Sequence, residues 1–182
     1  MKAILLLGLK GTGKSVVANY LSNKYKLPIH KLGKKIRDLL SLEGKVVTEE
    51  KINERGKYLK ENLESHSIGE LYLEEIKRLD KKKIVVVDSP RDIFDIKFYE
   101  GLFQTYSVGV FTEKEGRYDR LLKRKREGDA LTIEGIIKED KNQASNEAVN
   151  FMLCDYLLLN QEGKEKEFYE DIEKIFKKIK DY

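Results

Sequence analysis

The chain has 182 residues, of which 40% are hydrophobic and 37% charged, a composition that supports one folded domain and excludes a disordered chain. Its 36 basic and 32 acidic residues leave a net charge of only +4, which does not favour a nucleic acid or an anionic membrane as partner. The single cysteine, Cys154, excludes an intrachain disulfide and a multi-cysteine zinc site. No apolar run approaches the roughly 18 residues of a membrane span, and the N-terminal run leads directly into a motif. We therefore expect a cytoplasmic protein without a membrane anchor.

Short apolar runs alternate with longer amphipathic segments along the chain. Five runs predict strands, at residues 2–7, 28–32, 83–88, 105–111 and 154–160. The segments between and after them predict helices, at residues 14–26, 34–42, 49–64, 68–80, 92–101, 114–126, 132–146 and 164–180. The last helix carries the clearest apolar stripe, at Phe168, Ile172, Ile175, Phe176 and Ile179. Because continuously apolar strands separated by helices are typical of parallel sheets covered on both faces, we expect a three-layer α/β/α fold around a five-stranded parallel sheet.

Residues 8–15, Gly-Leu-Lys-Gly-Thr-Gly-Lys-Ser, match the phosphate-binding pattern G-x-x-x-x-G-K-[ST]. The motif follows the first predicted strand and opens the first helix, where main-chain N–H groups and the helix N-terminus can stabilise phosphate charge. Lys14 is expected to reach the β- and γ-phosphates of a nucleotide, and Ser15 is expected to bind Mg²⁺. We predict that the other loop residues also bind the nucleotide: Gly8, Lys10, Gly11, Thr12, Gly13 and Val16. The motif predicts a P-loop NTPase fold.

Arginine is scarce in this lysine-rich chain, and it is clustered. Four of the eight arginines lie within residues 117–126, and Arg117, Arg120 and Arg124 recur at the spacing of one helical face. An arginine that meets a transferring phosphoryl group can raise the rate by about 10³- to 10⁵-fold. We therefore predict catalytic roles for Arg124 and Arg117. A solvated basic face, or one that contacts RNA, is the alternative.

Asp88 ends the third predicted strand. Ligands of open α/β sheets gather at this end of the strands, and an aspartate there can hold Mg²⁺. We predict that Asp88 is catalytic and binds the metal together with Ser15; a cap for the next helix is the alternative. His30 and His66 have no accompanying ligand cluster, so we expect neither to bind a metal.

Four segments carry a resemblance to a known superfamily: Gly33-Lys34-Lys35-Ile36-Arg37, Asp88-Ser89-Pro90-Arg91, residues 117–124 and Cys154-Asp155-Tyr156-Leu157-Leu158-Leu159-Asn160. In this order they resemble motifs of the nucleoside monophosphate kinases, which include adenylate kinase and dephospho-coenzyme A kinase. The closest resemblance is to a small, mainly archaeal group of dephospho-coenzyme A kinase-like proteins. It implies ATP as the nucleotide, with Arg120 and Asn160 beside its base and Arg124 on the transferring phosphate. It also implies that Arg37 and Arg91 bind the phosphate of the acceptor.

The resemblance implies a single P-loop kinase domain over residues 1–182, with a core at 1–33, 81–123 and 147–182, a helical acceptor-binding insertion at 34–80 and a short lid at 124–146. Two features depart from it. Lys34 stands where the superfamily has an aspartate, and residues 132–146 lack the arginines of related lids. Two functions therefore stay open: an ATP- and Mg²⁺-dependent kinase for a nucleoside monophosphate or dephospho-coenzyme A type of acceptor, and a nucleotide-binding regulatory module or slow ATPase acting on a protein or RNA partner. The oligomeric state is not indicated.

Overall fold

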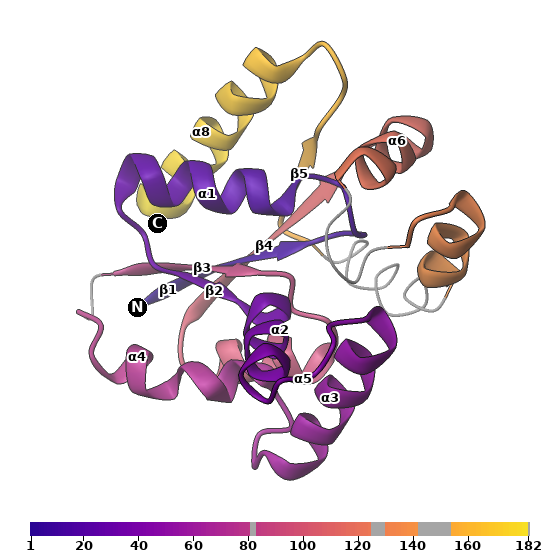
Figure 1. Ribbon diagram of the computed structural model, residues 1–182. Coiled ribbons are helices and arrows are strands. Elements are labelled where there is room, and N and C mark those ends of the chain that lie inside the picture. Colours follow the sequence, from indigo (N-terminus) through magenta and orange to yellow (C-terminus); the bar gives the residue numbers. More distant parts are fainter. Residues whose placement is uncertain (81–82, 125–129, 142–153, 182) are drawn as a thin grey trace.

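The computed structural model describes residues 1–80, 83–124, 130–141 and 154–181. Its centre is a five-stranded sheet in the order β2-β3-β1-β4-β5 (Figure 1). The strands are β1 (Lys2–Leu7), β2 (Ile29–Lys31), β3 (Ile84–Asp88), β4 (Gln104–Phe111) and β5 (Tyr156–Leu159). Every pair is parallel, so all five strands end at the same edge of the sheet. The predicted α/β fold with five parallel strands is confirmed.

Helices connect the strands and cover both faces of the sheet. They are α1 (Lys14–Tyr25), α2 (Leu32–Leu42), α3 (Glu49–Asn62), the 3-10 helix η1 (Ile68–Tyr72), α4 (Leu73–Lys77), α5 (Ile93–Glu100), α6 (Lys114–Arg124), a helix at residues 133–141 and α8 (Glu165–Asp181). No described helix is long and apolar enough to cross a membrane.

The structure differs from the single helix predicted over residues 68–80, because η1 and the short α4 take its place. At Gly69 the chain runs so close to α5 that a Cβ would lie 2.5 Å from Cδ1 of Phe98. Glycine is a weak helix former, and its close approach to α5 fixes the chain here in a conformation other than the regular helix that the neighbouring residues favour. Helix α2 also begins at Leu32, directly after β2, rather than at residue 34.

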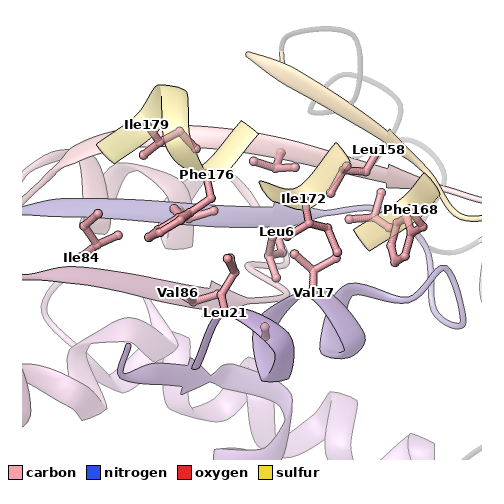
Figure 2. Close-up of a cluster of buried hydrophobic side chains, with 14 residues drawn as sticks. Leu6, Val17, Leu21, Ile84, Val86, Leu158, Phe168, Ile172, Phe176 and Ile179 are labelled. Atoms are coloured by element: carbon pink, nitrogen blue, oxygen red, sulfur yellow. The ribbon is translucent and has the colours of Figure 1, made fainter. Parts of the chain in front are cut away.

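One face of the sheet packs against α1 and α8 (Figures 1 and 2). The stripe predicted on the last helix supplies this core: Phe168, Ile172, Phe176 and Ile179 are buried, and Ile175 packs partly buried beside them. These side chains meet β-strand residues such as Leu6 and α1 residues such as Val17, both labelled in Figure 2.

The opposite face of the sheet packs against α2, α4 and α5 (Figure 1). Leu32, Ile36 and Leu40 of α2 share this second core with Val85 and Val87 of β3. The first helix of the predicted insertion is therefore built into the main body of the protein. The division into core, insertion and lid remains a prediction, and residues 125–129 and 142–153 of the predicted lid and core lie outside the described residues.

Candidate active site

A cleft of about 1480 Å³ opens at the carboxyl edge of the sheet. Its wall includes Lys31 at the end of β2, Asp88 at the end of β3, and Gly8 and Asn160 just after β1 and β5. This is the edge at which open α/β sheets bind ligands. The cleft brings together most of the predicted site residues: Gly8, Lys10, Gly11, Gly13, Lys14, Ser15, Val16, Arg37, Asp88, Arg91, Arg120, Arg124 and Asn160. Thr12 and Arg117 are the two predicted site residues that do not line it.

The phosphate loop, residues 8–13, has a shape that depends on its glycines. Gly8 (φ +130°) and Gly13 (φ +108°) both adopt positive φ values that other residues rarely take. A Cβ would overlap the main chain of β4 at Gly8 and the side-chain amide of Asn160 at Gly13. Nδ2 of Asn160 donates to the carbonyl oxygen of Thr12 at 2.8 Å. The end of β5 therefore holds the phosphate loop in place through this one amide.

Lys14 is the first residue of α1, and its side chain folds into the phosphate loop. Its Nζ donates to the carbonyl oxygens of Gly8 and Leu9, the latter at 2.8 Å. From this position the ammonium can exchange carbonyl oxygens for the phosphate oxygens of a nucleotide. Thr12 has a different role, because its buried hydroxyl donates to Leu9 at 3.0 Å and closes the loop from within.

Ser15 and Asp88 are in direct contact beside the phosphate loop. Oγ of Ser15 donates to Oδ2 of Asp88 at 2.8 Å, and Oγ of Ser89 donates to Oδ1 at 2.9 Å. Asp88 does not cap the next helix, because Asp92 caps α5 by accepting from two of its main-chain N–H groups. The helix-cap alternative for Asp88 therefore fails.

A hydroxyl and a carboxylate are oxygen ligands of the kind that Mg²⁺ prefers. Within the described parts of the chain, no three His, Cys, Asp or Glu side chains gather into a complete metal-binding set. Magnesium commonly binds through one or two protein ligands, nucleotide phosphates and water. Ser15 and Asp88 fit that partial kind of site.

Two arginines from different elements meet beside Gly33, near the start of α2. A Cβ at Gly33 would lie 3.6 Å from Nη2 of Arg91 and 3.8 Å from Nη2 of Arg37. Nη1 of Arg91 donates to the amide oxygen of Asn53 at 3.1 Å, which orients the guanidinium from α3. Two guanidinium groups that converge in this way suit a shared anion with several oxygens, such as a phosphate.

Asp95, which the sequence analysis did not single out, anchors this part of the cleft. Its fully buried carboxylate accepts from the main-chain N–H of Arg91 at 2.9 Å and from Nζ of Lys60 at 3.0 Å. It also accepts from the hydroxyl of Ser67 and from the next main-chain N–H, at 2.9 and 3.0 Å. Asp95 thus joins α5, α3, the start of η1 and the loop that carries Arg91. The Asp-x-x-Asp spacing at the start of α5 was the available signal.

Arg120 and Arg124 of α6 both line the cleft. Nη2 of Arg120 donates to the carbonyl oxygen of Asn160 at 3.4 Å, a long contact. Its Nη1 is buried and has no hydrogen-bond partner among the described residues. A buried donor without a partner is costly in a folded protein, so this atom is suited to a ligand acceptor in the cleft.

Arg117 lies on the same helix but points elsewhere. It is 4% exposed and forms a bidentate ion pair with Asp140 in the helix at residues 133–141. Its Nη1 also donates to the main-chain carbonyl of Lys10 at 2.9 Å. The structure therefore does not bring Arg117 into the cleft, and it gives this guanidinium the role of joining α6 to the phosphate loop. Helical spacing alone could not distinguish the two environments.

Lys10 joins three parts of the cleft wall. Its Nζ donates to Oε2 of Glu49 at 2.8 Å and to Oε2 of Glu139 at 3.0 Å. Glu49 begins α3, and Glu139 lies in the helix at residues 133–141. An ammonium of the phosphate loop thus bridges the predicted insertion and the predicted lid. Neither glutamate was predicted as a site residue, because nothing in the local sequence distinguishes it from other charged helix residues.

Comparisons with known proteins agree with this architecture. A family model described as an AAA domain matches residues 4–150. A UPF0200 protein of Pyrococcus abyssi (strain GE5 / Orsay) is 31% identical over 183 residues, which cover 97% of this chain and 96% of the relative. The chain belongs to these two families.

The fold of this chain is similar to those of solved kinases. A dephospho-CoA kinase from Campylobacter jejuni is 20% identical, covers 100% of this chain and 98% of its own, and superposes with a TM-score of 0.58. A shikimate kinase from Aquifex aeolicus vf5 is 17% identical, covers 96% of each chain and has a TM-score of 0.56. These likenesses confirm the predicted fold. They do not distinguish dephospho-coenzyme A kinase from shikimate kinase as the nearer relative.

Proposed function

We propose that this protein is an ATP- and Mg²⁺-dependent kinase that transfers the γ-phosphoryl group to a small phosphate-bearing acceptor of the nucleotide type, such as a nucleoside monophosphate or dephospho-coenzyme A. One observation carries the proposal: a single cleft is lined both by the phosphate loop and by the separate pair Arg37 and Arg91. A nucleotide hydrolase needs one anion site and a positioned water. A kinase for a phosphate-bearing acceptor needs two anion sites.

The donor half of the site follows from the phosphate loop. Its main-chain N–H groups and the N-terminus of α1 would hold the β- and γ-phosphates, with Lys14 reaching them from within the loop. The base would lie toward Asn160 and toward Arg120, whose buried Nη1 has no hydrogen-bond partner in the described parts of the chain. Ser15 and Asp88 would hold Mg²⁺, which when bound neutralises charge on the phosphate oxygens.

In the transfer step an oxygen of the acceptor attacks the γ-phosphorus, the bond to the bridging oxygen breaks, and ADP leaves with the bonding electron pair. A phosphate oxygen attacks as an anion, whereas a hydroxyl would release its proton to solvent in the same step. Lys14 and Arg124 would stabilise the charge that spreads over the transferring group. Arg37 and Arg91 would hold the acceptor in line for attack. Arg117 would act indirectly, because its bond to the carbonyl of Lys10 positions the phosphate loop.

The test is the release of ADP from Mg-ATP with a panel of acceptors: ribo- and deoxynucleoside monophosphates, dephospho-coenzyme A and a blank without acceptor. Lys14→Ala serves as the inactive variant, and Lys166→Ala, whose side chain is 90% exposed on α8, serves as its matched control. The proposal expects one class of acceptor to stimulate release in the wild type and in Lys166→Ala only.

Equal, slow release in every well would instead support a nucleotide-binding regulatory module or slow ATPase acting on a protein or RNA partner. The exposed ion pair between Lys34 and Asp38, 2.6 Å long, is compatible with either function, because it leaves Arg37 beside Arg91.

A further inference from the structure

An aromatic pair lines the cleft in the same region as the two acceptor arginines. Phe94 of α5 and His66, which precedes η1, lie edge to face with ring centroids 5.8 Å apart and an interplanar angle of 68°. Phe94 is 49% exposed, although it stands only three residues after Arg91. A large aromatic ring left half-open on a cleft wall offers a surface on which a planar ligand can stack.

His66 is held in a defined orientation beside this ring. Its Nδ1 lies 2.8 Å from the carbonyl oxygen of Lys60. A carbonyl can only accept, so Nδ1 carries the proton, and in the neutral ring Nε2 is left as an acceptor. Nζ of Lys60 is itself fixed by Asp92 and Asp95, at 2.5 and 3.0 Å. The imidazole is therefore tied to the last turn of α3, whose Lys60 side chain is in turn bound to α5 and its cap.

The backbone of His66 is also unusual. Its φ of +53° places it in the left-handed region, which a residue other than glycine seldom adopts. Such strain persists only where the surroundings impose it, and it is concentrated at ligand-binding positions. The strained backbone and the oriented ring occur at one residue of the cleft wall.

Helix α3 gives the spacing between this aromatic pair and the acceptor arginines. Asn53 contacts Arg91, and Lys60 contacts His66. The two α3 residues are seven positions apart, which corresponds to about 10 Å along a helix. The anion site and the aromatic site therefore contact α3 at points about 10 Å apart along the helix. This arrangement suits an elongated molecule with a phosphate at one end and a planar ring at the other.

We infer that Phe94 and His66 form a binding site for a heteroaromatic ring of the acceptor, with Phe94 stacking on the ring and Nε2 of His66 accepting from one of its N–H groups. This inference rests on the kinase function proposed above for the origin of the acceptor. It restricts the acceptor to phosphate esters that carry such a ring, and it disfavours sugar phosphates and simple alcohols, which would leave Phe94 in water.

The test compares ligand binding by calorimetry, with Mg²⁺ and a non-hydrolysable ATP analogue filling the donor half. The probes are the four common nucleoside monophosphates and ribose 5-phosphate, which has a phosphate and no aromatic ring. Phe94→Leu keeps an apolar side chain and removes the ring, whereas Phe94→Tyr keeps the ring. Ile93→Leu is the matched control, since Ile93 is equally 49% exposed on the same helical turn and is not among the residues that line the cleft.

Wild-type protein is expected to bind at least one nucleoside monophosphate more tightly than ribose 5-phosphate. Phe94→Leu is expected to lower the affinity for that nucleotide about tenfold and to leave the affinity for ribose 5-phosphate unchanged. Ile93→Leu is expected to behave as wild type. Phe94→Tyr, which keeps an aromatic ring, is expected to keep the preference for the nucleotide over ribose 5-phosphate. His66→Asn, which tolerates the left-handed backbone but has a shorter side chain, is expected to weaken the nucleotide about fivefold.

The inference is overturned if the wild type binds ribose 5-phosphate as tightly as every nucleotide. It is also overturned if Phe94→Leu lowers the affinity for nucleotides and for ribose 5-phosphate equally. Acceptor-dependent ADP release, measured separately with Mg-ATP on the same protein variants, distinguishes this failure from that of the proposed function. Ring-dependent binding without any stimulated release would reject the kinase and keep the ring site. If an acceptor stimulates ADP release and its KM is the same in Phe94→Leu as in the wild type, the ring site alone is rejected.

Discussion

Arg117 and Asp140 form a buried, bidentate ion pair that joins α6 to the helix at residues 133–141, and the same guanidinium donates to the carbonyl of Lys10 at 2.9 Å. Lysine in place of this arginine keeps the charge. Its single ammonium cannot form the two hydrogen bonds to Asp140 and the hydrogen bond to the carbonyl of Lys10 in the planar geometry of a guanidinium. We expect Arg117→Lys to lower the free energy of unfolding by about 1–3 kcal/mol and to weaken ATP binding through the displaced loop. Urea unfolding and ATP calorimetry measure the two effects.

Arg55→Lys is the control for this substitution. Arg55 of α3 pairs with Glu43 in a more exposed position, with 23% and 30% of the side chains accessible. Exposed ion pairs contribute little to stability. We therefore expect Arg55→Lys to change the free energy of unfolding by less than about 1 kcal/mol and to leave ATP binding unchanged. If Arg117→Lys behaved like Arg55→Lys in both measurements, the positioning role of Arg117 would have to be abandoned.

Gly13 is packed against Asn160 in a conformation that excludes a side chain. Alanine there would strain a φ of +108° and overlap the amide of Asn160. We expect Gly13→Ala to lower the free energy of unfolding by at least about 2 kcal/mol and to abolish measurable ATP binding. Gly44 provides the contrast: its φ is +68°, and no neighbouring atom lies within 4 Å of a Cβ there.

Gly44→Ala is therefore expected to cost about 1 kcal/mol from backbone strain alone and to leave ATP binding intact. Adding Asn160→Ala to Gly13→Ala should restore part of the lost stability, because it removes the overlap but not the strain. Equal losses in Gly13→Ala and Gly44→Ala would show that Asn160 does not constrain the loop.

The parts of the fold that the sequence predicts best are those set by local pattern. The buried strand β3 is a continuous apolar run, and the phosphate loop has a spacing fixed by glycine and by the helix that follows. The convergence of Arg37 and Arg91 beside Gly33 agrees with the resemblance, but no local pattern could have placed the two guanidinium groups together. The fold alone brings them to one point.

Sequence patterns are least informative where a side chain could face either of two neighbours. Arg117 shares a helical stripe with Arg124, yet it turns to Asp140, because α6 packs against residues 133–141 on that side. His30 is a comparable case. Its sequence surroundings indicate no structural role, whereas its ring is fully buried and packs against Tyr72 and Tyr99. Tertiary packing, which residue spacing does not contain, decides both.

Asp88 contacts Ser15 at 2.8 Å and caps no helix, so its charge is available to a metal ion. Asp88→Asn keeps the size and hydrogen-bonding capacity of the side chain but removes that charge. We expect the Mg²⁺ concentration required for half-maximal ATP binding or turnover to rise about 10- to 100-fold. Asp171→Asn, at an exposed position on α8, is expected to leave the magnesium titration unchanged. An unaltered titration in Asp88→Asn would remove this residue from the proposed metal site.

His30 makes the stability of the fold dependent on pH. Its ring is fully buried, with Nδ1 2.8 Å from the hydroxyl of Tyr99, and burial lowers its pKa to about 4. In the unfolded chain the pKa is near 6.5, so between pH 6.5 and 4 the unfolded state binds more protons than the folded state. The neutral His30 therefore contributes about 3 kcal/mol to the free energy of unfolding. This contribution is complete above pH 6.5 and is lost as the pH falls toward 4.

Urea unfolding at pH 7.5, 6.0 and 5.0 measures this loss against a variant, His30→Leu, that cannot titrate. The variant is expected to be less stable at pH 7.5, because the hydroxyl of Tyr99 loses its partner. The difference in unfolding free energy between the two proteins should shrink as the pH falls, since carboxylates that titrate in this range are common to both. A difference that stays constant from pH 7.5 to 5.0 would mean that His30 keeps an ordinary pKa in the fold. In that case Glu75, whose Oε1 lies 3.6 Å from Nε2 of His30, would have to stabilise the protonated ring.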